Sequence, residues 1–250
     1  MYNLTAREIY FRYPGRDDWA LEDVDCVWHK GETILLVGPA GAGKSTLGRV
    51  FKGLLKPERG RIVLQSETLV KIAKSEELIN LVSWADSQPE RQIFAETVQD
   101  EIAFGPIQRG LPADEVERLV RRAFEWAGLD FDKFSELDPL SLSGGEKRRI
   151  ALASAVAAPT DFFILDEPGA GLDDESIART RNTIWKLGEG AAGVLVISHN
   201  PADFFDLADR VWLMEKGKVK VEQAARKSDL ALIEAWLQNP AMEGLPESAR

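Results

Sequence analysis

The sequence predicts an α/β fold with a mostly parallel β-sheet at its core. Continuous apolar runs bounded by turn residues occupy 33–37, 162–165 and 194–197, and such runs are typical of strands that are buried on both faces. Segments in which apolar residues have helical spacing separate these runs. Because buried strands alternate with helices along the chain, we expect neighbouring strands to run parallel.

The remaining elements are predicted from shorter patterns. Polar and apolar residues roughly alternate near the N-terminus, which indicates short strands around a turn at Pro14 and Gly15. The additional strands are expected at 4–13, 24–28, 78–84, 210–214 and 219–221. Helices are expected at about 44–52 and at 228–237, and residues 239–250 are expected to be loose.

The character of the sequence changes between about 96 and 158. Apolar residues with helical spacing dominate there, as at Val116, Leu119 and Val120, and strand-like runs are lacking. We therefore expect a helical subdomain that is inserted into the α/β core. The predicted organisation is one domain over 1–225, with its β subdomain and core at about 1–95 and 159–225, followed by a C-terminal helix and tail at 226–250.

Composition and charge narrow the classes of function. The chain has 250 residues, of which 31 are Lys or Arg and 41 are Asp or Glu, so its formal net charge is −10. This balance argues against general nucleic-acid binding, which needs clustered cations. The apolar runs are shorter than the roughly 18 residues of a spanning helix, and no signal peptide is visible at the start. A membrane role would therefore need a partner, and the single Cys26 fits a reducing cytoplasm.

A glycine-rich loop lies between the buried run at 33–37 and the expected helix. Its residues are Gly38, Pro39, Ala40, Gly41, Ala42, Gly43, Lys44, Ser45 and Thr46. Glycines let successive backbone N–H groups approach phosphate oxygens, and the helix adds its positive N-terminal end. We expect Lys44 to contact the β- and γ-phosphates of ATP and Ser45 to coordinate Mg²⁺. A chance glycine turn is the alternative, and the strand–loop–helix context disfavours it.

Two carboxylates, Asp166 and Glu167, end the buried run at 162–165. The carboxyl end of a parallel strand is where open α/β sheets bind ligands. Asp166 is suited to hold Mg²⁺, and Glu167 to polarise the attacking water as a general base. Solvated acids at a strand end are common, so the catalytic interpretation depends on the phosphate loop. His199 also follows a buried strand and suits a position beside the γ-phosphate, although a single histidine there is more often structural.

Residues 142–149 form a second glycine-containing segment before a helix. Ser143 and Glu146 have the spacing of a capping box. A capping box does not explain the consecutive Gly144 and Gly145, because glycines cost a helix about 1 kcal/mol each. Adjacent glycines favour close approach of the backbone to an anion. Since the sequence has no second phosphate loop, this anion would be an ATP held by another copy or by a homologous subunit.

These motifs together resemble those of the ABC ATPases, over about 7–221. Residues 142–146, Leu-Ser-Gly-Gly-Glu, are similar to the signature motif of that family. The other resemblances are Tyr13 to the aromatic residue that stacks on adenine, 38–46 to the Walker A loop, 162–167 to Walker B with its catalytic glutamate, 171–173 with Asp173 to the D-loop, and His199 to the switch histidine. Residues 92–106 and 142–149 are similar to segments of the energy-coupling-factor ATPases in particular.

The resemblance implies an architecture and a role. It implies a phosphate-loop NTPase (RecA-like) core with an N-terminal antiparallel β subdomain, and a helical subdomain that carries the signature. Two ATPase subunits, identical or homologous, would sandwich two ATP molecules, so that Ser143 and Gly145 of one chain complete the site of the other. Closure would drive integral membrane subunits docked near 92–106, at the cytoplasmic face of the cell membrane. Energy-coupling-factor ATPases power uptake of vitamins or of metal ions such as cobalt and nickel in prokaryotes, and the sequence does not indicate which cargo applies here.

Two other roles fit the sequence less well. A soluble ABC ATPase of DNA repair would need a long coiled coil, for which the segment between Lys44 and Ser143 is too short, and translation-type members usually carry two ATPase units. A regulatory subunit without hydrolysis would be expected to lack Glu167 or His199, and both are present.

One position departs from the family pattern. Counting back from Pro89, Ser87 stands where relatives carry the glutamine that contacts Mg²⁺, and Gln88 follows it. Either Gln88 reaches the metal because the loop shifts by one residue, or Ser87 touches it through a water. The match over 89–94 leaves no gap and favours Ser87. In a third possibility neither side chain contacts the metal, and water completes its shell.

Overall fold

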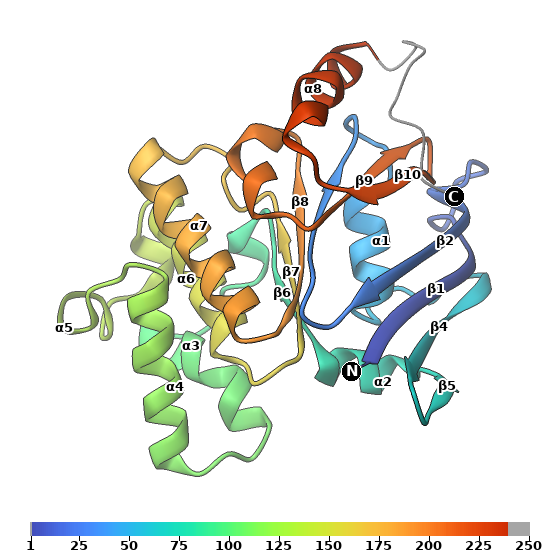
Figure 1. Ribbon diagram of the computed structural model, residues 1–250. Helices are drawn as coiled ribbons and strands as arrows, with labels where there is room; N and C mark the ends of the chain where they lie inside the picture. The colour runs from blue at the N-terminus through green and yellow to red at the C-terminus, as the bar shows by residue number, and fades with distance from the viewer. Residues whose placement is uncertain (1, 240–250) are drawn as a thin grey trace.

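The computed structural model describes residues 2–239 and has two β-sheets (Figure 1). The larger sheet has six strands in the order β10-β9-β3-β8-β7-β6. Its strands are β3 (Thr33–Val37), β6 (Val82–Ala85), β7 (Phe162–Asp166), β8 (Gly193–Ser198), β9 (Arg210–Glu215) and β10 (Lys218–Ala224). All neighbouring pairs are parallel except β9 with β10. The predicted mostly parallel core is therefore confirmed.

The smaller sheet is antiparallel and has the order β2-β1-β4-β5. Its strands are β1 (Tyr2–Phe11), β2 (Leu21–His29), β4 (Arg59–Ser66) and β5 (Val70–Ile72). Strands β4 and β5 were not predicted from the sequence. Val70 and Ile72 of the edge strand are 69% and 61% exposed, so this strand lacks the buried apolar pattern that identifies the others.

Helix α1 (Lys44–Phe51) lies between the two sheets, whereas most other helices cover the opposite face of the large sheet (Figure 1). The helices beyond α1 are α2 (Ser75–Leu81), α3 (Val98–Gln108), α4 (Ala113–Trp126), α5 (Phe131–Phe134), α6 (Gly144–Ala157), α7 (Asp174–Glu189) and α8 (Leu230–Gln238). Short 3-10 helices occupy Pro89–Arg91, Pro139–Ser141, Pro201–Asp203, Phe205–Leu207 and Lys227–Asp229.

The side chains of each core strand alternate between two hydrophobic clusters. Ile34 and Leu36 of β3 pack with α1 and the small sheet, whereas Leu35 and Val37 pack with the helices on the other face. This two-sided burial explains why the strand is continuously apolar. Helix α8 packs Ile233 against the helical face; most of the loose tail that was expected at 239–250 lies outside the described residues.

The prediction of one strand over 78–84 was wrong. Residues up to Leu81 belong to α2, and β6 begins at Val82. Glu77 accepts a hydrogen bond from the backbone N–H of Lys74, which fixes the first turn of α2, and Leu78 anchors the helix in the core. A short helix that runs directly into a buried strand gives one apolar run without turn residues between them, so hydrophobic periodicity alone does not separate the helix from the strand.

Candidate active site

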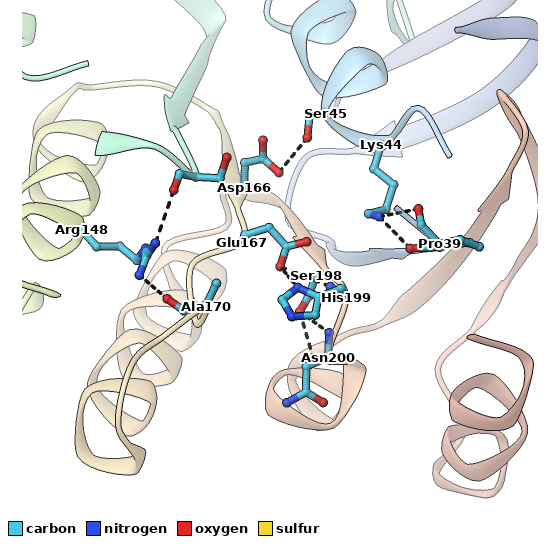
Figure 2. Close-up of polar contacts among 12 residues, drawn as sticks. Pro39, Lys44, Ser45, Arg148, Asp166, Glu167, Ala170, Ser198, His199 and Asn200 are labelled. Carbon is cyan, nitrogen blue, oxygen red and sulfur yellow. Dashed lines mark hydrogen bonds and ion pairs between the residues drawn. The ribbon is translucent and has the colours of Figure 1, made fainter. Parts of the chain in front are cut away.

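The phosphate loop connects β3 to α1 at the carboxyl edge of the large sheet. A Cβ atom at Gly38 would lie 2.1 Å from the carbonyl oxygen of Met214, so only glycine fits there. Lys44 Nζ donates hydrogen bonds to the carbonyl oxygens of Gly38 (2.7 Å) and Pro39 (3.1 Å), as Figure 2 shows. Burial lowers the pKa of Lys44, and the charge of Glu167 acts in the opposite direction. The ammonium therefore lies within electrostatic reach of the carboxylates.

A cavity of about 390 Å³ opens above this loop, and Tyr13, Lys44 and Glu167 are among the residues that line it. Its size is that of a small-molecule site. The Tyr13 hydroxyl lies 3.1 Å from Thr46 Oγ1. Trp19 also lines the cavity. It was not predicted as a site residue, although an aromatic residue a few positions after Tyr13 in the same loop is a signal that could have identified it.

Asp166 lies at the end of β7 and is 2% exposed. Ser45 Oγ donates a hydrogen bond to Asp166 Oδ1 at 3.1 Å, whereas Asp166 Oδ2 is buried and has no partner among the described residues. Burial raises the pKa of Asp166 to about 6, and the neighbouring charges of Asp86 and Glu167 add to the effect. A hydroxyl beside a carboxylate with an unpartnered oxygen is a set of hard oxygen ligands, so these residues fit Mg²⁺.

Glu167 and His199 contact each other across the ends of β7 and β8 (Figure 2). His199 Nδ1 lies 2.6 Å from Glu167 Oε2. Because an ionised carboxylate only accepts, Nδ1 carries the proton in this contact. The backbone φ of Glu167 is +53°, and its N–H donates to the carbonyl oxygen of Ile197 at 2.9 Å. The left-handed backbone at Glu167 is a strained conformation of the kind that clusters at functional sites.

The segment 143–146 forms the first turn of α6 and does not line the cavity. Glu146 Oε2 accepts hydrogen bonds from the backbone N–H (2.9 Å) and the hydroxyl (2.7 Å) of Ser143. These bonds lower the pKa of Glu146. In the described part of the chain, a Cβ atom at Gly144 would meet nothing within 4 Å, and one at Gly145 would meet only Leu172, at 3.7 Å. The capping box is therefore present, and packing within this chain does not require the glycines.

Asp173 lies at the N-terminus of α7, where its side chain accepts a hydrogen bond from the backbone N–H of Ser176 at 2.9 Å. It does not line the cavity either. Its contacts are those of a helix cap.

Ser87 and Gln88 follow β6. The carbonyl oxygen of Ser87 accepts a hydrogen bond from Arg148 Nη2 at 3.4 Å, and Gln88 is exposed. Within residues 2–239, neither side chain forms a hydrogen bond, so the structure does not connect them to Ser45 or Asp166. Asp86, which was not predicted, directly follows β6, the strand that pairs with β7, and its charge acts on Asp166. Its position directly after a buried strand is the signal that could have identified it.

A family model described as ABC transporter matches residues 21–170. The chain belongs to the ABC transporter family. Two curated relatives narrow the assignment to energy-coupling factor transporter ATP-binding proteins. EcfA2 of Clostridium tetani (strain Massachusetts / E88) is 38% identical over 86% of this chain and 75% of the relative. EcfA of Methanocaldococcus jannaschii is 35% identical over 99% of this chain and 89% of the relative. The chain is thus an ABC-type ATPase.

Solved structures agree with the fold. The structure of cbiO1 from Clostridium perfringens, described as part of the ABC transporter complex cbiONQ, is 26% identical, covers 95% of both chains and has a TM-score of 0.77. A dimeric ABC transporter cassette, MJ0796, has a TM-score of 0.78 at 22% identity, which supports the fold alone. No helix within residues 2–239 is long and apolar enough to cross a membrane.

Proposed function

We propose that this chain hydrolyses Mg·ATP at the carboxyl edge of the large sheet and thereby powers an energy-coupling-factor importer for a vitamin or a transition-metal ion. The observation that carries the proposal is the contact between His199 and Glu167 beside a cavity that Lys44 also lines. A carboxylate held by a histidine next to a phosphate loop is an arrangement for activating water against a terminal phosphate.

Each residue has a proposed task in the reaction. The N–H groups of the loop 38–43 and the Lys44 ammonium bind the phosphates, and Tyr13 stacks on the adenine ring. Glu167 accepts a proton from the attacking water, and His199 orients Glu167 through Nδ1. When its Nε2 also carries a proton, His199 would donate from that nitrogen toward the γ-phosphate. Mg²⁺, when bound at Ser45 and Asp166, would neutralise phosphate charge as the bond to the leaving group breaks.

The proposal includes a second ATPase subunit. Among the described residues, Gly144 has open space beside it at the N-terminus of α6, a Cβ atom at Gly145 would meet only Leu172, at 3.7 Å, and Ser143 lies in the same exposed turn. Backbone N–H groups at a helix N-terminus bind anions. These features support a composite site in which this turn contacts the γ-phosphate held by another subunit, with Asp173 close to the same interface.

The proposed membrane partner would dock on an exposed apolar surface within 92–107. Phe94, Phe104 and Ile107 are 60%, 44% and 55% exposed. The rings of Phe94 and Phe104 pack edge to face, with 4.7 Å between their centroids. A contiguous exposed apolar group is typical of an interaction surface. The integral subunits of the importer would cover it at the cytoplasmic face of the cell membrane, where co-purification from membranes identifies them.

Glu167→Gln tests the hydrolytic part of the proposal. The amide keeps the shape of the side chain and cannot take up a proton, so ATP turnover should fall at least about a hundredfold while ATP affinity is kept. The variant should also accumulate as an ATP-bound dimer in gel filtration with Mg²⁺. Near-normal turnover would assign the activation of water to another residue.

The composite site is tested by complementation. Ser143→Arg blocks the turn that faces the partner, and Lys44→Ala blocks the phosphate loop. If sites form between chains, mixing the two inactive variants restores one intact site per heterodimer and part of the turnover. No recovery at any mixing ratio would argue that the sites lie within single chains or must work in pairs.

The soluble alternative, an ABC ATPase of DNA repair or translation, is not favoured by the relatives, which are transporter ATP-binding proteins. It predicts that no integral membrane protein accompanies the chain during purification.

A further inference from the structure

Asp86 lies beside Asp166 at the carboxyl edge of the large sheet. Strands β6 and β7 are parallel neighbours, and Ala85 pairs with Leu165, so the next residues of the two strands are adjacent. Neighbouring strands lie about 4.8 Å apart. Trp84 and Ile164 both point to the cluster that contains α1, and since side chains alternate along a strand, Asp86 and Asp166 point to the same side.

Two side chains of helix α1 contact these carboxylates. Ser45 Oγ donates to Asp166 Oδ1 at 3.1 Å, and Arg49 Nη2, one helical turn later, lies 3.8 Å from Asp86 Oδ2. The charge of Asp86 is among the causes that raise the pKa of Asp166, which is a second sign that the two groups are close. The side chain of Asp86 is 17% exposed.

The conformation of Asp86 is fixed by hydrogen bonds on both carboxylate oxygens. Asp86 Oδ1 accepts from the backbone N–H of Gln88 at 2.9 Å, and Asp86 Oδ2 accepts from Trp84 Nε1 at 3.2 Å. The Asp86 N–H donates to the side-chain oxygen of Gln92 at 3.1 Å. A carboxylate offers about four acceptor sites, so each oxygen of Asp86 retains capacity for one more donor.

The carboxylates of Asp86 and Asp166 have fewer cationic partners than negative charges. Arg49 is the only Lys or Arg within ion-pair distance of Asp86 in the described part of the chain, and no such cation contacts Asp166. Asp166 Oδ2 is buried, and nothing within residues 2–239 forms a hydrogen bond with it. Buried carboxylates are normally paired or bound to metal, so one negative charge at this edge lacks compensation.

We propose that Asp86, beside the residues Ser45 and Asp166 that would hold Mg²⁺, accepts hydrogen bonds from the water shell of the nucleotide-bound metal. Asp86 thereby takes the metal-facing task that was expected of Ser87 or Gln88. This inference rests on the proposed Mg·ATP chemistry. Ser87 is tied through its backbone to Arg148 and Gln88 is exposed, whereas Asp86 is the residue of this segment that lies beside Asp166.

The effect of the Asp86 charge on nucleotide affinity, measured with and without Mg²⁺, distinguishes a metal-facing role from a structural one. Without metal, Asp86 repels the phosphates of ATP, so Asp86→Asn should bind metal-free nucleotide more tightly. With Mg²⁺, the same substitution removes a partner of the metal's water shell, and such losses typically weaken metal affinity about 10-fold or more. A merely structural role would shift both affinities in the same direction.

The experiment measures equilibrium binding of a non-hydrolysable ATP analogue to the full chain, once with EDTA and once with Mg²⁺. The dissociation constant with EDTA, divided by the dissociation constant with Mg²⁺, should be at least about fivefold smaller in Asp86→Asn than in the wild type. The asparagine oxygen still accepts from Gln88 or Trp84, so the fold should be kept; Asp86→Ser gives the same readout if the asparagine variant does not fold. Ser87→Ala and Gln88→Ala are the matched controls, and their ratios should equal that of the wild type.

Each outcome has one meaning. A wild-type ratio in both neutral variants of Asp86 overturns the inference, and a loss confined to Gln88→Ala assigns the metal to Gln88 instead. If the wild-type chain itself binds the analogue equally well with and without Mg²⁺, the proposed Mg·ATP function fails, and it fails before any variant is compared.

Discussion

Gly43 and Gly41 of the phosphate loop form a natural pair for testing how tightly the loop is built. Gly43 precedes α1 with a φ of +102°, and a Cβ atom there would lie 2.5 Å from the carbonyl oxygen of Ala20 and 2.9 Å from Met214 Cε. Gly41 has a φ of +77°, and a Cβ atom there would meet none of the described residues within 4 Å. Alanine at either position is therefore strained, but only at Gly43 does it also collide with the backbone.

The expected costs follow from these two contacts. A left-handed conformation costs a non-glycine residue about 1–2 kcal/mol, and overpacking against a backbone oxygen adds about 1–3 kcal/mol. Alanine recovers about 0.4–1 kcal/mol by restricting the unfolded chain. Gly43→Ala should therefore lower the free energy of unfolding by about 2–4 kcal/mol, and Gly41→Ala by about 0.5–1.5 kcal/mol.

Thermal denaturation followed by circular dichroism, without nucleotide, measures the difference. For a domain of this size, 1 kcal/mol corresponds to about 2–4 °C in Tm. Gly43→Ala should lower the Tm by about 4–16 °C and Gly41→Ala by about 1–6 °C. Equal shifts in the two variants would refute the reasoning, because they would show that the carbonyl of Ala20 does not confine the loop.

Three other perturbations probe the surroundings of the site. His199→Ala should reduce turnover about a hundredfold or more with ATP affinity unchanged, because His199 holds Glu167 through a 2.6 Å contact; steady-state kinetics beside equilibrium binding decides this. Arg148→Gln should lower the free energy of unfolding by about 1.5–3 kcal/mol, because the guanidinium donates to the carbonyl oxygens of Ala170 and Ser87; urea unfolding measures it, and an unchanged midpoint would mean that these bonds contribute nothing. Burial raises the pKa of the Cys26 thiol. Its contribution to the free energy of unfolding is therefore fully present below the unfolded pKa of about 8.5 and is lost as the pH rises above that value. A thiol reagent at pH 8 should modify Cys26 only as fast as the protein unfolds.

The parts of the fold that were predicted from the sequence are those with one dominant local signal. Strands β3, β7 and β8 are buried on both faces, so their sequences are continuously apolar and bounded by turns. Strand β5 lies at an exposed edge and is held by pairing to β4, which no local pattern records. The boundary at Val82 was missed because the apolar anchors of α2 and β6 follow one another without a break.

The candidate site divides in the same way. Asp166 and Glu167 lie at the end of one buried strand, and Lys44 follows another through the phosphate loop. Parallel topology therefore brings them to one edge of the sheet. The contact of Glu167 with His199 and the position of Asp86 depend on strand order, and strand order is set by packing between distant segments. The sequence motifs thus identify candidate site residues, whereas the order of the strands in the sheet determines which of these residues contact each other.

The charges at this edge suggest why a metal would be integral to the proposed chemistry. Asp86, Asp166 and Glu167 bring three carboxylates to the place that accepts a highly charged phosphate chain in the proposed function. Lys44 and the N-terminus of α1 supply positive potential from the loop side, but within the described residues the carboxylate side has Arg49 alone in ion-pair contact, and that contact reaches Asp86. A divalent cation between the carboxylates and the phosphates would change this repulsion into attraction on both sides. The same carboxylates that oppose binding of bare ATP would then select Mg·ATP, and Glu167 would remain free to accept the proton of the attacking water.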